Sequence, residues 1–409
     1  MRKRNYLKGK AILAQSGGCT AVINQSLIGA VETALDNPAM TRVLGSLHGV
    51  EGLLKGQFVD MKVQSRKLLQ DIRCMPSAAL GSSRRKLRPG EERKVLDRFR
   101  KSNVRYLFMI GGNDTAETIL RIANAAENKK YALRVIHIPK TIDNDLMETD
   151  HCPGYGSAAR FAAITTQEAA LDTRAMRQVD PVKMIELMGR NSGWIVAASA
   201  LLKRDPIDPP HLLLLPEIPF EEKVFLRRVE KILSRSGYCV IVMSETIRDA
   251  GGKRIGARTE GIIKDPFGHP YVESPAAILC RLVESRLKVR ARFDKPGTIQ
   301  RMSIPYVSGV DQQEAYEAGQ KAVQWAIRGV SKVMVCFVRG KGRYRIDYKP
   351  VPLEKIPGRE RYLPASFLNH DKTMITPAFV RYALPLIGKG LPAFPSLNNK
   401  SKLKRRQQP

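Results

Sequence analysis

The twelve residues RVIHIPKTIDND, at positions 134–145, join an apolar run to a charged turn. The first five predict a buried strand, because short runs rich in Val and Ile are typical of strands in parallel sheets. Lys140, Asp143 and Asp145 then place one ammonium and two carboxylates in the turn that follows. Polar groups at the carboxyl end of a buried strand are typical of α/β proteins, which bind their ligands at that edge of the sheet.

The same alternation of short apolar runs and amphipathic stretches continues along the chain. Further strands are predicted at 11–14, 104–110, 183–187, 212–215, 238–243 and 332–338. Helices are predicted at 21–35, from about 115, and at 156–177, 192–202, 220–234, 275–287 and 312–327. Because 409 residues exceed one simple core and the strands alternate with helices, we expect two Rossmann-like α/β/α lobes with largely parallel sheets.

Composition narrows the classes of function. The net charge of +30 attracts anions, so phosphorylated small molecules and nucleic acids are both candidates. The sequence has no zinc-finger spacing, RNA-recognition aromatic motif or basic heptad region, so we do not expect nucleic acid as a partner. No apolar run approaches the roughly 20 residues of a membrane helix. We expect no secretory signal, and six cysteines without C-x-x-C spacing predict reduced thiols and a cytoplasmic protein.

Two glycine pairs follow predicted strands and precede predicted helices, Gly17-Gly18 and Gly111-Gly112. Glycine lets the backbone approach a phosphate, and the amides at a helix start donate hydrogen bonds to it. Either pair alone also suits a plain strand-to-helix turn, and Asp114 can simply cap its helix. The functional alternative is a pair of phosphate-binding turns, with Asp114 as a carboxylate near a metal.

The charged turn carries more information than the glycine pairs. Phosphoryl transfer needs a base for the attacking hydroxyl, a carboxylate near Mg²⁺ and a cation on the phosphates. Asp143, Asp145 and Lys140 are groups of those three types. The alternative is a surface turn with solvated charges, but such turns seldom follow a strand this apolar.

Over about residues 10–340 the sequence resembles the phosphofructokinase family. Seven clusters carry the resemblance, in the family's order: Gly17-Gly18, Gly81-Ser82-Ser83-Arg84, Gly111-Gly112-Asn113-Asp114-Thr115, Pro139 to Asp145, Met188-Gly189-Arg190, Ser244-Glu245 and Gly297-Thr298-Ile299-Gln300-Arg301. The resemblance implies a Mg²⁺-dependent phosphotransferase that acts on fructose 6-phosphate, with the active site in the cleft between the two lobes.

By this resemblance, four residues of the charged turn form the catalytic set. Asp143 matches the general base that accepts the proton of the sugar 1-hydroxyl. Asp145 matches a carboxylate near metal and base, and Thr141 matches a residue that orients the transferring phosphoryl group. Lys140 completes the set and also contacts the donor. The metal is assigned to Asp114, because the family's usual acidic contact is replaced here by an asparagine at position 113.

The resemblance also implies two binding sets. The donor phosphates are assigned to Gly17, Gly18, Arg84, Gly112, Asp114 and Lys140. The sugar phosphate is assigned to Thr141, Asp143, Met188, Gly189, Arg190, Glu245, Arg292 and Arg301. In the family the guanidinium groups that clamp the 6-phosphate come partly from a neighbouring subunit, so a dimer or tetramer is expected. Pro181 departs from the family, since bacterial ATP-using members carry an intersubunit arginine there.

Two positions indicate the donor. ATP-using members have glycine where this chain has Asp114 and Lys140, whereas pyrophosphate-using members resemble this chain. A carboxylate at Asp114 occupies the space of a nucleotide α-phosphate and repels it, and Lys140 adds a cation for pyrophosphate. The expected reaction is therefore transfer from pyrophosphate to fructose 6-phosphate.

Three alternatives stay open. They are an ATP-dependent phosphofructokinase, an enzyme that uses sedoheptulose 7-phosphate as acceptor, and a non-catalytic regulatory or RNA-binding member of the family. Intact Asp143, Asp145 and Arg190 argue against the last of these.

The expected division of the chain follows from these assignments. Residues 1–155 form the donor-phosphate lobe, completed by about 300–345, and residues 156–299 form the sugar-phosphate lobe. Residues 346–409 are expected to form a C-terminal extension that ends in a basic, mobile tail, with basic residues concentrated at 400–406.

Overall fold

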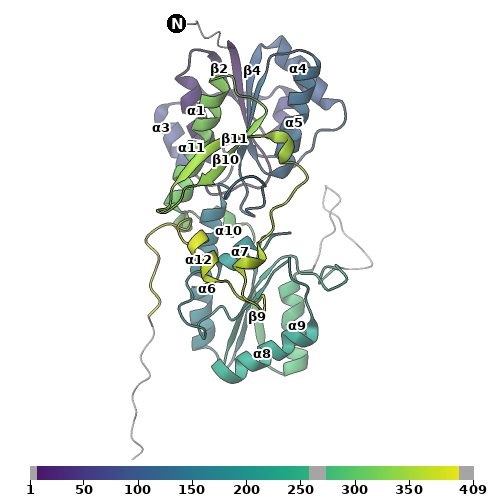
Figure 1. Ribbon diagram of the computed structural model, residues 1–409, viewed down its shortest axis with the longest axis vertical. Coiled ribbons are helices and arrows are strands. Elements are labelled where there is room, and N and C mark those ends of the chain that lie inside the picture. The colour runs from purple at the N-terminus through teal and green to yellow at the C-terminus, as the bar shows by residue number, and fades with distance from the viewer. Residues whose placement is uncertain (1–6, 258–272, 396–409) are drawn as a thin grey trace, which may run out of the picture.

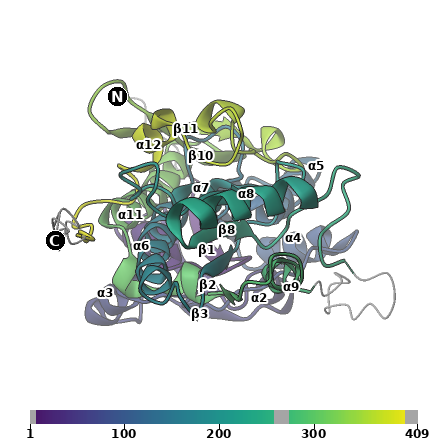
Figure 2. The ribbon, with the colours of Figure 1, turned by 90° about the horizontal axis from the view of Figure 1, so that it is seen from below.

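The computed structural model describes residues 7–257 and 273–395, so the predicted basic tail lies outside the described residues. Two α/β lobes are stacked along the long axis of the molecule (Figure 1). In the view from below, α6, α8 and α9 of the second lobe lie over the first lobe (Figure 2). The predicted fold class, two lobes with largely parallel sheets, is confirmed.

The first lobe is built on a seven-stranded sheet in the order β11-β10-β5-β4-β1-β2-β3. Its strands are β1 (Gly9–Gln15), β2 (Met40–Ser46), β3 (Phe58–Asp60), β4 (Val104–Gly111), β5 (Arg134–Pro139), β10 (Val333–Arg339) and β11 (Ile346–Pro352). Only the two edge strands, β3 and β11, pair antiparallel to their neighbours. Parallel strands need helical crossovers, so both faces of this sheet are covered and its strands are almost fully apolar.

Alternate strand residues face two separate cores in the first lobe, as the two-residue period of a strand requires. One core packs beneath α1 (Ile23–Leu35), α3 (Arg66–Cys74) and α11 (Gly309–Ile327). The other packs beneath α2 (Val50–Lys55), α4 (Glu91–Lys101) and α5 (Asn113–Asn128). The chain proceeds from β1 to β2 on one side, then to β4 on the other. This reversal of strand order puts the turns after β1 and β4 side by side, which is where α/β sheets bind ligands.

The second lobe has a four-stranded parallel sheet in the order β7-β8-β6-β9. Its strands are β6 (Val182–Leu187), β7 (Leu212–Leu214), β8 (Cys239–Ser244) and β9 (Ala291–Asp294). Helices α6 (Tyr155–Ala175) and α7 (Trp194–Ala198) cover one face. Helices α8 (Glu222–Ser236) and α9 (Pro275–Leu287) cover the other, and the short α10 (Ile299–Met302) follows β9.

The C-terminal part of the chain contacts both lobes. Strand β11 lies within the expected extension but is an edge strand of the first sheet. The chain continues through η2 (Leu353–Lys355), η3 (Ala365–Phe367) and α12 (Pro377–Ala383). Leu363, Leu368 and Phe379 then pack with Trp194 in the core of the second lobe. The division into lobes and extension stays a prediction, but residues 353–395 are a packed part of the molecule.

Each strand predicted from the sequence overlaps an observed strand, whereas β2, β3, β9 and β11 were not predicted. Strand β9 has four residues, and Arg292 and Phe293 within it are exposed, so it lacks the buried apolar run of the predicted strands. Among the described residues, no helix is long and apolar enough to cross a membrane.

Candidate active site

The charged turn leaves β5 at the edge where the turns after β1 and β4 also end. The backbone N–H of Lys140 donates to the carbonyl of Gly111 at 2.9 Å, which extends the sheet pairing by one residue. Thr141 then pairs with the residues before α6, because its N–H donates to the carbonyl of Pro153 at 3.2 Å. Backbone hydrogen bonds to the end of β4 and to the residues before α6 thus hold the start of the turn.

Asn144 gives the turn its shape. Its φ of +55° lies in the left-handed region, which asparagine tolerates better than most residues. Its fully buried side chain accepts a hydrogen bond from the N–H of Cys152 at 3.0 Å and donates one to the hydroxyl of Tyr382 at 2.9 Å. Asp143 and Asp145 flank this fixed residue and are thereby held on either side of it.

Asp143 lies where the two lobes meet. Its carbonyl accepts a hydrogen bond of 2.8 Å from the hydroxyl of Ser192, in the second lobe. Burial raises the pKa of Asp143 to about 7, and the carboxylates of Asp145 and Glu245 add to this, partly offset by Arg190 and Lys140. A carboxylate with a pKa near 7 is suited to take a proton at physiological pH.

Lys140 is buried, with 3% of its surface exposed, and its ammonium donates to the carbonyl of Gly18 at 2.7 Å. Burial lowers its pKa to about 8, although the nearby carboxylates favour the charged form. A Cβ on Gly17, whose φ is +77°, would lie 3.2 Å from the ammonium nitrogen. The glycine pair therefore allows a close approach of this cation to the turn after β1.

Two guanidinium groups share the turn after β1 with Lys140. A Cβ on Gly18 would lie 2.4 Å from Nη1 of Arg301 and 4.0 Å from Nη2 of Arg84. Burial and the neighbouring Arg84 lower the pKa of Arg301. Within 7–257 and 273–395, none of these three cations forms a salt bridge with a carboxylate. The turn is therefore a concentration of positive charge suited to a polyanion. Arg301, which we assigned to the sugar phosphate, thus lies beside Gly18, and it is also close enough to Asp143 and Glu245 for their carboxylates to favour its charged form.

In the second lobe, the residues at the carboxyl ends of β6 and β8 lie next to the group around Asp143. The hydroxyl of Ser244 donates to the carbonyl of Gly189 at 2.6 Å, and the N–H of Glu245 donates to the carbonyl of Leu187 at 2.8 Å. These bonds fix the Met188-Gly189-Arg190 turn beside Glu245, whose pKa is raised by burial. The guanidinium of Arg190 and the carboxylate of Glu245 lie close enough to Asp143 to shift its pKa. The predicted substrate residues therefore lie near the predicted base.

Two assigned residues lie apart from this group. The carboxylate of Asp114 is 73% exposed and pairs with the ammonium of Lys86 at 2.8 Å. Arg292 lies opposite Lys183, near the start of β6, and pairs with Asp180 at 2.9 Å. The other end of β6 carries the Met188 turn, so this arginine is directed away from the base of its own chain.

The sequence interpretation missed Arg361 and Glu360, which follow β11 in the C-terminal part of the chain, and Asn191, which Glu360 contacts. Arg361 donates from its guanidinium to the carbonyl of Asn144 at 2.8 Å. Glu360 accepts two hydrogen bonds of 3.0 Å from the amide of Asn191. Burial raises the pKa of Asp145, and the carboxylate of Glu360 contributes to the rise. No motif marked these residues, because their partners are mainly backbone carbonyls and a single amide.

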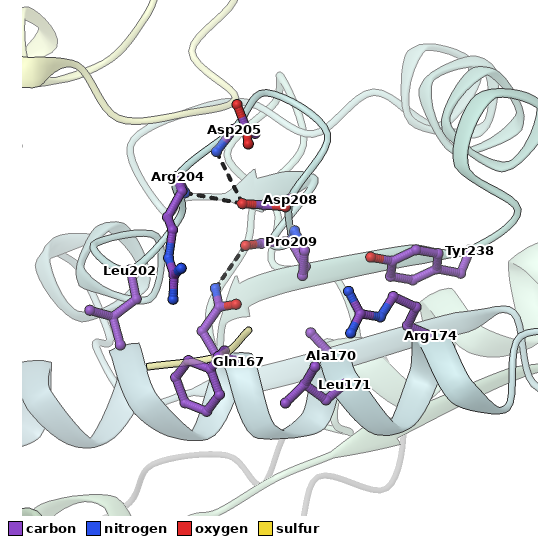
Figure 3. A pocket seen from close by; sticks show the side chains of 11 residues that line it. Gln167, Ala170, Leu171, Arg174, Leu202, Arg204, Asp205, Asp208, Pro209 and Tyr238 are labelled. Carbon is purple, nitrogen blue, oxygen red and sulfur yellow. Dashed lines mark hydrogen bonds between the residues drawn. The ribbon is translucent and has the colours of Figure 1, made fainter. Parts of the chain in front are cut away.

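A pocket of about 210 Å³ lies elsewhere, on the second lobe (Figure 3). It is lined by Gln167 and Arg174 of α6, by Arg204 in the loop after α7, and by Tyr238 directly before β8. None of the assigned site residues lines it, so it is separate from the group around Asp143.

The paired lobes, the cationic glycine turn and the buried carboxyl group of Asp143 between them are the features of an α/β phosphotransferase. The chain belongs to the phosphofructokinase family, because the family model described as Phosphofructokinase matches residues 10–326.

Relatives extend the similarity beyond that range. The chain is 39% identical over 391 residues to a pyrophosphate–fructose 6-phosphate 1-phosphotransferase of Rhodospirillum rubrum, covering 94% of this chain and 96% of the relative. A sulfofructose kinase of Alkalicoccus urumqiensis is 32% identical, covering 89% and 93%. The crystal structure of a pyrophosphate-dependent phosphofructokinase from Nitrosospira multiformis superimposes with a TM-score of 0.86 at 32% identity, covering 96% of this chain and 94% of that one.

Proposed function

We propose that this protein transfers a phosphoryl group from pyrophosphate to the 1-hydroxyl of fructose 6-phosphate, giving fructose 1,6-bisphosphate and phosphate. The observation that carries the proposal is the buried Lys140 on the Gly17-Gly18 turn, with Arg84 and Arg301 beside it. A compact tetraanion can occupy such a turn and needs no nucleoside pocket. The relatives named above support the same donor and acceptor.

The residues divide into a donor side and an acceptor side. Arg190, Met188 and Glu245 bind the sugar phosphate, and Asp143 receives the proton of the 1-hydroxyl. A base with a pKa of about 7 is half deprotonated at neutral pH, so it can take the proton in one direction and return it in the other. We propose that the reaction runs in both directions, in glycolysis and gluconeogenesis. Thr141 orients the transferring group, since its hydroxyl accepts from the N–H of Asp143 at 3.1 Å and so lies beside the base.

Mg²⁺ is the proposed cofactor, and the donor set fits it. The described residues hold no group of three or more His, Cys, Asp or Glu suited to a metal. Mg²⁺ at phosphate sites usually takes one or two carboxylates and completes its shell with phosphate oxygens and water. We assign Asp145 to it, because the predicted ligand Asp114 is exposed, pairs with Lys86 and lies apart from the group around Asp143. When bound, the ion would neutralise charge on the transferring phosphoryl group.

Three further assignments belong to the proposal. We place the enzyme in the cytoplasm and expect a homo-oligomer. Arg292 lies on the edge strand β9, away from Asp143 of the same chain, and we assign it to binding the sugar phosphate of a neighbouring subunit. The lobe divisions at 155 and 299 assign donor and acceptor binding to separate parts of the chain.

One assay tests the proposal directly. Purified protein is given fructose 6-phosphate and Mg²⁺ with pyrophosphate or ATP, and fructose 1,6-bisphosphate is measured. We expect kcat/KM for pyrophosphate to exceed that for ATP by about 10²-fold or more. Sedoheptulose 7-phosphate is offered as a second acceptor. A preference for ATP would refute the donor assignment, and no turnover with either donor would favour a non-catalytic family member.

A further inference from the structure

The segment 358–363 lies beyond the family match and bridges the two sides of the site. On the first lobe, the amide of Asn113 donates to the carbonyl of Arg359 at 2.6 Å, and its oxygen accepts from the N–H of Gly358 at 3.2 Å. On the second lobe, the carboxylate of Glu360 accepts from Asn191, which follows Arg190. The segment therefore runs between the start of α5 and the sugar-phosphate turn.

Arg361 is the residue of this segment with most contacts to the charged turn. Its Nε and Nη2 donate to the carbonyl of Asn144 at 3.1 and 2.8 Å, and its N–H donates to the carbonyl of Asp145 at 2.8 Å. Nη1 donates to the carbonyl of Thr149 at 2.9 Å and to that of Asp150. One side chain thus holds both ends of the loop that begins at the base.

Arg361 is itself anchored in the second lobe. Its guanidinium carbon lies 4.5 Å from the centre of the Trp194 ring, within the range of a cation–π contact. The indole N–H of Trp194 donates to the carbonyl of Arg361 at 3.1 Å. Two residues on, the N–H of Leu363 donates at 3.0 Å to Glu217, which also accepts from the N–H of Gly193 at 2.8 Å. Through Arg361, the charged turn of the first lobe is therefore attached to the second lobe.

We propose that Arg361 is a positioning residue for phosphoryl transfer, holding the charged turn so that Asp143 and Asp145 face the substrates. The carbonyl of Asn144 lies between the two carboxylates in sequence, and this residue has the left-handed φ on which their directions depend. A planar guanidinium reaches several carbonyls at once in a fixed fork, which an ammonium cannot do. The inference rests on the proposed function only in taking Asp143 as the base.

The expected kinetic signature follows from what Arg361 contacts. Its hydrogen bonds go to the backbone of the turn, whereas Arg190 and Glu245 bind the sugar. Arg361→Ala should therefore lower kcat by about 10- to 100-fold, the scale of a misplaced reacting group, and leave KM for fructose 6-phosphate within about three-fold. Free guanidinium ion should restore part of the lost kcat, whereas ethylammonium should not.

A matched variant separates positioning from stability. Leu363 lies in the same segment, and its side chain is buried in the second-lobe core, the cluster to which Ile142 of the turn also belongs. Its N–H donates to Glu217, and it makes no hydrogen bond to the backbone of the turn. Leu363→Ala should lower Tm at least as much as Arg361→Ala yet keep the parent kcat when assayed well below Tm. If Arg361→Ala does not fold, Arg361→Lys is assayed in its place, with kcat again expected to fall by about ten-fold or more because the fork is lost.

Two results would overturn the proposal. One is a folded Arg361→Ala or Arg361→Lys variant whose kcat stays within about two-fold of the parent. The other is an equal loss of kcat in Leu363→Ala, which would make the effect one of general stability. The comparison uses whichever donor the parent prefers, so a parent that prefers ATP would refute the donor proposal and leave this test intact.

Discussion

The ammonium of Lys140, at the end of β5, hydrogen-bonds the carbonyl of Gly18, at the end of β1, across 2.7 Å. The two residues are far apart in sequence, and the bond joins the charged turn to the glycine turn. Both lie at the point where the strand order of the first sheet reverses. The relationship places a buried cation directly beside backbone that is free of side chains.

The charge of Lys140 should make donor binding depend on pH. Because burial lowers its pKa to about 8, the ammonium is present below that pH and is lost as the pH rises through it. KM for pyrophosphate should therefore rise above pH 8. Lys140→Met should have a high KM throughout the range and no rise attributable to this group. Initial rates at pH 6.5–9.5 check this, and a parent KM that stays flat across pH 8 would contradict it.

Loss of the base should appear in kcat. Asp143→Asn should lower kcat by about 10²–10⁴, the usual scale for a general base. In the parent, kcat should fall as the pH drops through about 7, because the raised pKa leaves Asp143 protonated below it. Arg190→Met removes a cation that lowers this pKa, so the acidic limb of its profile should move to higher pH. Turnover of Asp143→Asn within a few-fold of the parent would exclude this residue as the base.

The sequence predicted the strands of the two sheet centres and the charged turn, because buried strands and their polar ends leave a local pattern. It did not predict that Arg301 lies beside Gly18 as well as near Asp143, since a flexible guanidinium can reach either side of the site. Nor could it predict Arg361, whose partners are backbone carbonyls that no residue type reveals. Edge strand β9 escaped notice because only one of its four residues is buried.

A buried ionic network behind the turn should make stability depend on pH. His151 lies 2.8 Å from Asp150 and 2.7 Å from Glu314, and Asp150 also pairs with Arg339. Burial alone would lower the pKa of His151, but the two carboxylates raise it overall. A raised pKa contributes stability that is fully present below the ordinary histidine value of about 6.5 and is lost as the pH rises through the folded value.

The free energy of unfolding should therefore fall as the pH rises above neutrality, and His151→Gln should remove most of that dependence. The substitution should also cost about 3 kcal/mol near pH 6, since Glu314 loses its charged partner while Asp150 keeps Arg339. Urea unfolding at several pH values measures both effects. His370, which is fully exposed beside Asp371, provides the control, because His370→Gln should leave the curve unchanged. An unaltered pH dependence in His151→Gln would remove the network as its cause.

Substitutions at positions 114 and 140, which distinguish this chain from ATP-using relatives, should change which phosphoryl donor the enzyme prefers. Asp114→Gly removes a negative charge and opens space at the start of α5, so ATP should become usable, though poorly, because no adenosine pocket surrounds the site. The ion pair with Lys86 is exposed, so its loss should change stability by no more than about 1 kcal/mol. Lys86→Met breaks the same pair without altering Asp114, and is the matched control for effects of the pair itself.

Lys140→Gly should mainly weaken the use of pyrophosphate, since a charge-assisted contact to phosphate is worth roughly 1.5–3 kcal/mol. The two substitutions act on different parts of the donor, so the double variant should show the largest change in the ratio of kcat/KM for pyrophosphate to that for ATP. That ratio is measured for the parent, both single variants, Lys86→Met and the double variant at fixed Mg²⁺. If the ratio in the double variant equals that of the parent, selectivity resides elsewhere, and the segment at 358–361 beside Asn113 becomes the next region to vary.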